Sequence, residues 1–217
     1  MFKRKNILAV GAHADDVEIG CGGTVALHVR QGDNVILLIM AEPFFTNYDR
    51  NVLRSLKDGE IEMKNAADAL GVKLINLGFK DKSVMYSVET IEKINKVIDE
   101  YEIDTIYTHW HHDSNQDHSK TTHAVISAAR YVPNILMYEP MHPNAKTYTT
   151  FRSQVYVNIA PTFNIKMDSL RCHRSQVEKF GSGFLDAIEA RARYRGYEMG
   201  SKYAESFEVI QAVIEFG

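Results

Sequence analysis

The stretch NILAVGAHADD at residues 6–16 decides the fold and points to the functional site. Residues 6–10 form a short apolar run of the kind that a buried parallel strand shows. His13, Asp15 and Asp16 follow this run directly. Ligands of open α/β sheets bind at the carboxyl ends of the strands, so these side chains stand where a metal or catalytic site is expected. The alternative is an Asx turn with a capping aspartate, which is common where a strand leads into a helix.

Strand and helix patterns alternate outward from this stretch. Further apolar runs typical of strands lie at residues 34–40, 73–77 and 105–108. Helical patterns lie at residues 24–31, 54–70, 87–101 and 119–131. This order predicts an α/β fold with a Rossmann-like, mostly parallel sheet flanked by helices on both faces. The usual order of such a sheet, 3-2-1-4, would place the fourth strand beside the first.

The last third of the chain is less regular. Residues 135–138, 155–159 and 208–216 are typical of strands, and residues 163–180 and 185–199 are typical of helices. No internal repeat, low-complexity segment or linker interrupts the chain. We therefore expect residues 1–217 to form a single domain.

Composition excludes several classes of protein. The 217 residues are 45% hydrophobic and 24% charged, which is typical of a globular protein and not of a disordered chain, a collagen or a coiled coil. The net charge is −3 without a basic block, so we expect no nucleic-acid partner. No apolar run approaches the roughly 20 residues of a membrane span. Two cysteines, Cys21 and Cys172, give no disulfide framework, and we expect a cytoplasmic protein.

A second polar cluster follows the fourth predicted strand. Residues 109–118 read HWHHDSNQDH, with four histidines and two aspartates in ten positions. In the order 3-2-1-4 this loop meets the His13–Asp16 loop at one crevice. Imidazole and carboxylate ligands with an open position are typical of a catalytic zinc site, whereas structural zinc sites are closed by thiolates. One metal needs only three protein ligands, so some of His109, His111 and His112 are expected to be ordinary hydrogen-bonded residues.

The glycine-rich turn Gly20–Thr24 opens a helix and has two interpretations. Such a turn could cradle a phosphate, as in a nucleotide-binding module without catalysis. The two aspartates before it would repel a phosphate, and neither GxGxxG nor the P-loop spacing is present. Close packing of the turn on the sheet is favoured, with Cys21 as a small packed residue.

At these residues the sequence resembles the LmbE-like, or PIG-L, family of zinc-dependent N-deacetylases of the N-acetylglucosaminyl deacetylase type. The family's first motif, AHPDDE followed by GCGGT, stands here as AHADDVEIGCGGT at residues 12–24. Its second motif, HPDH, is matched by residues 115–118, which read NQDH. Weaker matches follow in order along the chain: Glu62 to Gly71, LGFKD at 77–81, YEP at 138–140, HRSQ at 173–176 and GSKYAESF at 200–207.

The resemblance implies a set of metal ligands and catalytic residues. The zinc ligands would be His13, Asp16 and His118. Asp15 would be the general base, and Asp117 would be the acidic residue of the second motif. The ion would be Zn²⁺, although Fe²⁺, Co²⁺ or Mn²⁺ also suits such ligands.

Four positions depart from the family pattern. Ala14 and Val17 replace a proline and a glutamate of the first motif. Asn115 replaces the first histidine of the second motif, which in the family stabilises the oxyanion or donates a proton; asparagine can donate a hydrogen bond but cannot supply a proton. Gly59 stands where the family has a substrate-binding arginine, and Arg54 is the nearest candidate to replace it.

The implied function is removal of an N-acetyl group from an N-acetylated amino sugar or sugar conjugate. Zinc would lower the pKa of bound water towards about 7, and Asp15 would take its proton. Asp113 and His112, which lie near the metal loop, are the favoured further site residues, with Asp113 as a substrate contact, and rim segments offer Tyr138, Glu139, Tyr148 and Arg152. The family also implies a homo-oligomer. The alternatives are a zinc amidase for another acyl group such as formyl, the nucleotide-binding module, and a metal-binding protein without activity.

Overall fold

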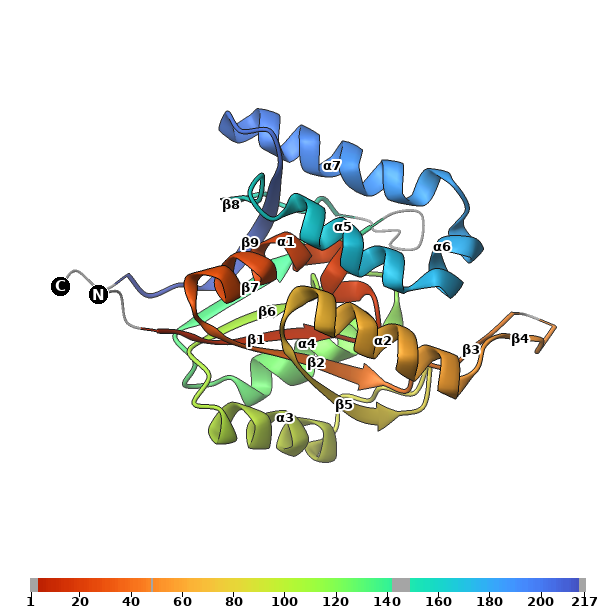
Figure 1. Ribbon diagram of the computed structural model, residues 1–217. Coiled ribbons are helices and arrows are strands. Elements are labelled where there is room, and N and C mark those ends of the chain that lie inside the picture. Colours follow the sequence, from red (N-terminus) through yellow and green to blue (C-terminus); the bar gives the residue numbers. More distant parts are fainter. Residues whose placement is uncertain (1–3, 48, 142–148, 215–217) are drawn as a thin grey trace.

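The computed structural model describes residues 4–47, 49–141 and 149–214, and its centre is a seven-stranded sheet (Figure 1). The strand order is β5-β2-β1-β6-β7-β9-β8. The strands of this sheet are β1 (Asn6–Gly11), β2 (Asn34–Ala41), β5 (Lys73–Phe79), β6 (Thr105–Thr108), β7 (Asn134–Tyr138), β8 (Val155–Asn158) and β9 (Ala204–Gln211). A separate antiparallel pair, β3 (Phe45–Thr46) and β4 (Val52–Arg54), projects from the body of the molecule (Figure 1).

The sheet is mostly parallel. The four pairings from β5 through β2, β1 and β6 to β7 are parallel. The pairings of β9 with β7 and with β8 are antiparallel. The first four strands of the central sheet, β1, β2, β5 and β6, therefore follow the order 3-2-1-4. The expected α/β class and the expected neighbourhood of β1 and β6 are both confirmed.

Helices cover both faces of the sheet because β1 is apolar on both sides. Ile7 and Ala9 pack towards one set of helices, and Leu8 and Val10 pack towards the other. In Figure 1, α1, α2 and α5 lie on one face and α3 and α4 on the other. The helices are α1 (Asp16–Gln31), α2 (Leu56–Leu70), α3 (Val88–Glu100), α4 (Gln116–Ala128), α5 (Phe163–Cys172), α6 (Arg174–Phe180) and α7 (Gly183–Met199).

Local signals explain several helix ends. Ser55 and Ser87 accept hydrogen bonds from the backbone N–H groups of Asp58 and Thr90, so both serines are N-caps. Gly32 and Gly71 end α1 and α2 in the left-handed conformation that glycine adopts without strain. In the described part of the chain, no helix combines the length and apolarity needed to cross a membrane.

Five elements differ in their bounds from the sequence-based expectation. α1 begins at Asp16 and not at Thr24, because the glycine-rich turn is itself helical apart from a kink at Cys21. α4 begins at Gln116 and not at Ser119, and α2 begins at Leu56, which leaves Arg54 in β4. The single helix expected at 163–180 is two helices that meet at His173. The last strand is shifted: β9 spans 204–211, and residues 215 and 216 of the strand expected at 208–216 lie outside the described residues.

The glycines of the turn permit close packing of α1 against the rest of the molecule. A Cβ at Gly23 would lie 2.7 Å from Cδ1 and 2.8 Å from Cβ of Ile159. A Cβ at Gly20 would lie 2.2 Å from the ring of Tyr138. The backbone amides of Gly23 and Thr24 already donate to the carboxylate of Glu205, at 3.0 and 2.7 Å. The amides that would cradle a phosphate are thus occupied by an internal carboxylate, which favours the packing interpretation of this turn.

Alanine substitutions at two neighbouring glycines test this packing. We expect Gly23→Ala to lower the free energy of unfolding by about 1–3 kcal/mol, because the branched side chain of Ile159 cannot move away cheaply. Gly22→Ala is the matched control. Its Cβ would come no closer than 3.4 Å to Lys166, so we expect no loss, or a gain of up to about 1 kcal/mol from helix propensity. Urea unfolding of both variants measures the difference, and equal midpoints would contradict the packing argument.

Candidate functional site

Two loops at the carboxyl ends of neighbouring strands form the site. β1 pairs with β6 in parallel, so the loop after β1 faces the loop after β6. His13, Asp15 and Asp16 come from the first loop and the start of α1, and Asp113, Asn115 and His118 come from the second loop and the start of α4. All six line a cavity of about 250 Å³.

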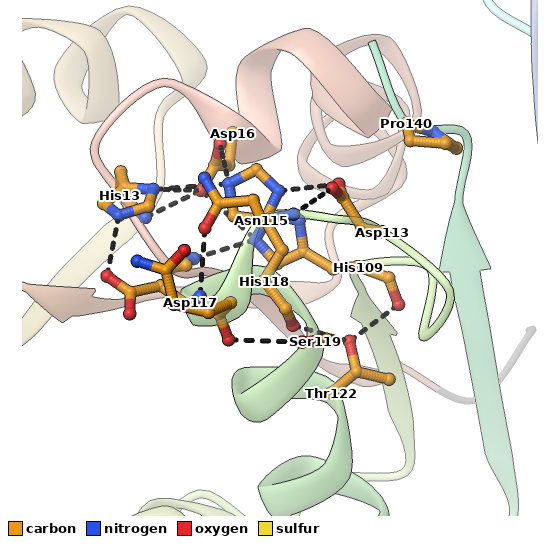
Figure 2. Close-up of polar contacts among 12 residues, drawn as sticks. His13, Asp16, His109, Asp113, Asn115, Asp117, His118, Ser119, Thr122 and Pro140 are labelled. Carbon is orange, nitrogen blue, oxygen red and sulfur yellow. Dashed lines mark hydrogen bonds and ion pairs between the residues drawn. The ribbon is translucent and has the colours of Figure 1, made fainter. Parts of the chain in front are cut away.

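His13, Asp16 and His118 present three ligand atoms to a common point (Figure 2). His13 Nδ1 lies 3.3 Å from His118 Nε2 and 3.5 Å from Asp16 Oδ2. His118 Nε2 lies 3.4 Å from Asp16 Oδ1. The two distances to Asp16 involve different carboxylate oxygens; taking one ligand atom from each residue, the three atoms lie within 4.8 Å of one another. Ligand atoms placed about 2.0–2.2 Å from a tetrahedral Zn²⁺ are about 3.3–3.6 Å apart. The donor set therefore suits a divalent ion with two imidazole ligands and one carboxylate.

In both His13 and His118, the ring nitrogen that points away from the common point contacts an aspartate carboxylate. His118 Nδ1 lies 2.7 Å from Asp113 Oδ2, and His13 Nε2 lies 3.2 Å from Asp117 Oδ2 (Figure 2). A carboxylate that accepts the proton of one ring nitrogen leaves the other nitrogen as the lone-pair donor. The two aspartates thus fix the tautomers in which Nδ1 of His13 and Nε2 of His118 face the common point.

The same contacts explain the charge state of the pair His13 and Asp16. Burial lowers the pKa of His13, but the hydrogen bonds and negative charges of Asp117 and Asp16 outweigh it and raise this pKa to about 10. Burial raises the pKa of Asp16, but the charge of His118 and the contacts with His109 and His13 hold it well below the usual range. These contacts therefore favour the protonated form of His13 at neutral pH.

Asp15 lies beside this cluster with its carboxylate in the cavity. It is 7% exposed and has a φ of 147°, a conformation that costs energy for a residue other than glycine. Its carboxylate takes part in no hydrogen bond or ion pair among the described residues. Burial raises the pKa of Asp15 to about 6, with a further contribution from Asp16, against the opposing charges of His173, Arg54 and His13.

The other histidines of the second cluster lie in different surroundings. His109 is buried, stacks on His118 with ring centroids 4.0 Å apart, and accepts the backbone N–H of Ala12 at 2.9 Å on Nε2. Burial, together with the charge of His118, lowers the pKa of His109 to about 4. His111 contacts the sulfur of Met137, and His112 packs against Trp110. Neither His111 nor His112 lines the cavity, which agrees with an ordinary residue at position 111 but does not favour His112 as a site residue.

The residues expected to bind substrate divide into two groups. One carboxylate oxygen of Asp113 lies 2.7 Å from His118 Nδ1, and the other accepts the backbone N–H of Asn115. These contacts favour a role for Asp113 in positioning His118 and not in binding substrate. Tyr138 donates its hydroxyl to the carbonyl of Val10 at 2.9 Å. Glu139 accepts hydrogen bonds from Arg195 and Ser206. All three line the cavity, but their polar groups are already used within the protein.

Arg54 and Asn115 keep donors for a ligand. Arg54 is 5% exposed and lines the cavity, yet its Nε and Nη1 have no hydrogen-bond partner. Asn115 is the N-cap of α4, and its Oδ1 accepts the backbone N–H of Asp117 at 2.9 Å. Only Nδ2 of Asn115 could therefore donate to a ligand. Arg152 pairs with Glu208 outside the cavity, and Tyr148 lies outside the described residues.

Sequence reasoning missed several residues near the ligands. Asp81 follows β5 and places Oδ1 3.6 Å from His13 Nε2; the rule of carboxyl strand ends applies to it as well. His173, where α5 meets α6, lies 3.1 Å from Glu18 through Nε2, and both side chains are 1% exposed. Lys179 and Phe180 of α6 also line the cavity, and no local signal in the sequence places them there.

Comparisons with known proteins agree with this geometry. The sequence profile of the family described as "PIG-L: GlcNAc-PI de-N-acetylase" matches residues 8–129. The uncharacterized deacetylase YaiS of Escherichia coli is 31% identical over 80% of this chain and 92% of its own length. Diacetylchitobiose deacetylase of Thermococcus kodakarensis is 28% identical over 96% of this chain and 84% of its own. Among solved structures, the 4-carboxy-2-hydroxymuconate hydratase GalB of Pseudomonas putida superposes with a TM-score of 0.85 at 18% identity, covering 98% of this chain and 99% of that one.

The proton on His13 makes metal binding depend on pH. Since the pKa of His13 is raised to about 10, a metal ion must displace this proton at any lower pH, and affinity should rise about tenfold per pH unit. We expect Zn²⁺ affinity to be roughly 100-fold higher at pH 8.5 than at pH 6.5. Competition with a chromophoric chelator measures it. His111→Ala, outside the ligand cluster, should keep the same slope, and an affinity that does not change with pH would contradict the assignment of His13.

Proposed function

The chain belongs to the PIG-L family of GlcNAc-PI de-N-acetylases, and we propose that it is a metal-dependent N-deacetylase that hydrolyses the acetamide of an N-acetylated amino sugar or sugar conjugate. One observation carries the proposal. The unpartnered carboxylate of Asp15 lies in one cavity with the convergent ligand atoms of His13, Asp16 and His118. We further propose that residues 1–217 form one domain, since a single sheet runs from β5 to β8. The cytoplasmic location and the homo-oligomer stay predictions.

Amide hydrolysis needs a nucleophilic water, stabilisation of the oxyanion and protonation of the leaving amine. A divalent ion held by His13, Asp16 and His118 supplies Lewis-acid chemistry, which acidifies water and polarises a carbonyl; Zn²⁺ suits the ligands. Asp113 and Asp117 hold the two histidine rings in place for that ion. These aspartates are then positioning residues.

Asp15 carries the proton. Its carboxylate takes a proton from the attacking water as the water oxygen bonds to the acetyl carbon. It returns that proton to the nitrogen as the C–N bond breaks, which leaves acetate and a free amino sugar. A carboxylate already paired in a salt bridge could do neither, so the absence of a partner for Asp15 supports this role.

Asn115 supports the reaction from the other side of the cavity. Its Oδ1 is used by the N-cap, and its Nδ2 donates a hydrogen bond to the carbonyl oxygen as negative charge develops there. Asparagine has no proton to release at neutral pH, so we assign protonation of the leaving amine to Asp15.

Two variants separate metal binding from proton transfer. We expect Asp15→Asn to retain about one divalent ion per chain and to lose acetate release by at least about 100-fold, because the base is gone and the ligands remain. We expect His118→Ala to lose the ion, and His111→Ala to keep both ion and activity. Elemental analysis beside acetate and formate assays on N-acylated glucosamines measures these outcomes. Equal loss of the ion in Asp15→Asn and His118→Ala would contradict the separation of roles.

Substitutions at Asn115 separate its two functions. Asn115→Ala should lower the free energy of unfolding by about 1 kcal/mol through loss of the N-cap, and Asn115→Ser should restore it because serine also caps helices. Both variants lack the Nδ2 donor, so we expect both to lose acetate release by about 10- to 1000-fold. The measurements are urea unfolding and initial rates. Full activity in Asn115→Ser would show that Asn115 is a cap and nothing more.

A further inference from the structure

The first turn of α1 carries two groups of the site and is separated from the rest of the helix. Asp15 and Asp16 stand at its start, and Cys21, with φ −145° and ψ 21°, interrupts the helix about one turn later. Asp15 itself has the unfavourable φ of 147°. One helical turn is not stable alone, and a strained residue persists only where its surroundings fix it. The position of this turn must therefore depend on contacts from outside the helix.

Charged side chains lie at both ends of the interruption. In an unbroken helix the carbonyl of Ile19 would accept the backbone N–H of Gly23. Here that N–H donates to Glu205 Oε1 at 3.0 Å, and the carbonyl accepts Lys166 Nζ at 2.9 Å and Arg191 Nη2 at 2.7 Å. Cations thus lie at the C-terminal end of the first turn, and a carboxylate lies at the N-terminal end of the second helical segment. Helix dipoles favour this arrangement.

Lys166 and Glu205 form a buried ion pair across the interruption. They are 1% and 4% exposed, and Lys166 Nζ lies 2.5 Å from Glu205 Oε1. Removing one member of such a pair is strongly destabilising, whereas replacing both by neutral groups of similar volume is often neutral or stabilising. A net gain in stability therefore does not explain the pair. Specification of one backbone conformation is a documented use of buried charged groups that needs no such gain.

The three charged residues come from the last third of the chain. Lys166 belongs to α5, Arg191 to α7 and Glu205 to β9. Figure 1 shows α5 beside α1, and the two helices are in contact. Arg191 also donates through Nη1 to the carbonyls of Glu139 and Pro140, at 3.2 and 3.1 Å. The same guanidinium therefore joins the first turn of α1 to a segment after β7 that lines the cavity.

We propose that Lys166, Arg191 and Glu205, which we call the clamp, are positioning residues that fix the first turn of α1 at the site. They act through the backbone, because the Ile19 carbonyl that they hold belongs to the residue whose N–H donates to the carbonyl of Asp15 at 2.9 Å. The catalytic consequence rests on the deacetylase function proposed above. The held position of the turn does not depend on a bound metal.

A double substitution separates positioning from stability. Lys166→Met and Glu205→Gln each leave a buried charge without its counter-ion, so we expect each single variant to lower the urea midpoint. The double variant Lys166→Met/Glu205→Gln removes both charges and should recover most of that loss. It still lacks the ammonium on the Ile19 carbonyl and one acceptor for the backbone amides. We therefore expect its Zn²⁺ affinity, measured by chelator competition, and its kcat for acetate release to stay about 10- to 100-fold below wild type.

Ile94→Ala is the matched control for lost stability. Ile94 is a fully buried residue of α3, which covers the opposite face of the sheet from α1. This variant should also lower the urea midpoint, because it leaves a cavity in the core. Since it lies away from the first turn of α1, its Zn²⁺ affinity and kcat should stay within about twofold of wild type.

Hydrogen exchange tests the clamp without a metal or a substrate. In the metal-free protein we expect the amides of residues 17–24 to exchange at least about tenfold faster in the double variant than in wild type, because less opposes local opening of the turn. Arg191→Gln keeps the Lys166–Glu205 pair and removes one donor from the Ile19 carbonyl, so it should give a smaller acceleration. This variant decides the question if the double variant fails to fold.

The outcomes distinguish this inference from the deacetylase function. If the wild type neither binds Zn²⁺ nor releases acetate, the deacetylase function fails, and faster exchange in the double variant still supports the clamp. Wild-type exchange in the double variant, or in Arg191→Gln where the double variant does not fold, would overturn the proposal. Faster exchange with wild-type Zn²⁺ affinity and kcat would also overturn it, because the clamp would then hold the helix without positioning the site.

Discussion

The parallel pairing of β1 with β6 is the constraint on which the site depends. Ile7 faces Thr105 and Ala9 faces Tyr107, so the two strands end together and their loops meet. Because both strands are buried on both faces, neither can slip without exposing apolar side chains. The hydroxyl of Thr122 further ties α4 to the carbonyl of His109 at 2.8 Å (Figure 2). The 3.3–3.5 Å spacing of the ligand atoms is thus a consequence of sheet register more than of the loops themselves.

Buried polar groups behind the glycine-rich turn form a hydrogen-bonded network, whereas some of those in the cavity lining have no partner. Behind the glycine-rich turn, Glu205 accepts two backbone amides and the hydroxyl of Thr24, and Lys166 pairs with it at 2.5 Å. That network satisfies its members and closes a surface that could otherwise bind an anion. In the cavity lining, by contrast, buried atoms of Arg54 and Asp117 have no hydrogen-bond partner. Native proteins leave few such groups, and those left commonly lie where a ligand completes them. Buried atoms of Glu18, Thr108, Thr121 and His173, outside that lining, also lack a partner, so the missing partners are not confined to the cavity.

The sequence predicted those parts of the site that strand ends and strand order place in space. It did not predict the parts that depend on turns and on contacts between distant segments. His13, Asp16 and His118 were accessible to prediction because strand ends and strand order place them, and their convergence is confirmed although their role as ligands stays a proposal. Asp113 was placed near the metal loop correctly, yet its hydrogen bond to His118 depends on a turn that no pattern indicates. Lys179 reaches the cavity only because the helix expected at 163–180 breaks at His173, where Nε2 of that histidine bonds to Glu18. Such tertiary contacts override local helical pattern.

The fold alone does not select the reaction, because a hydratase shares it with a TM-score of 0.85. Reaction and substrate must then be decided by the groups that the loops add to a common sheet. In this chain the residues proposed as metal ligands and as base lie at the ends of β1 and β6, which suits the proposed hydrolysis. The β3–β4 pair and α6 supply a different kind of group, cations and aromatic rings, and they come from the least regular segments of the chain. With such a division, residues at the strand ends would determine the reaction, and residues of the peripheral elements would determine which substrate binds. A side chain at Gly59 would collide with the carbonyl oxygen of Pro43, whereas Arg54 of β4 lines the cavity, so in this chain the irregular segment supplies its arginine from β4 and not from α2.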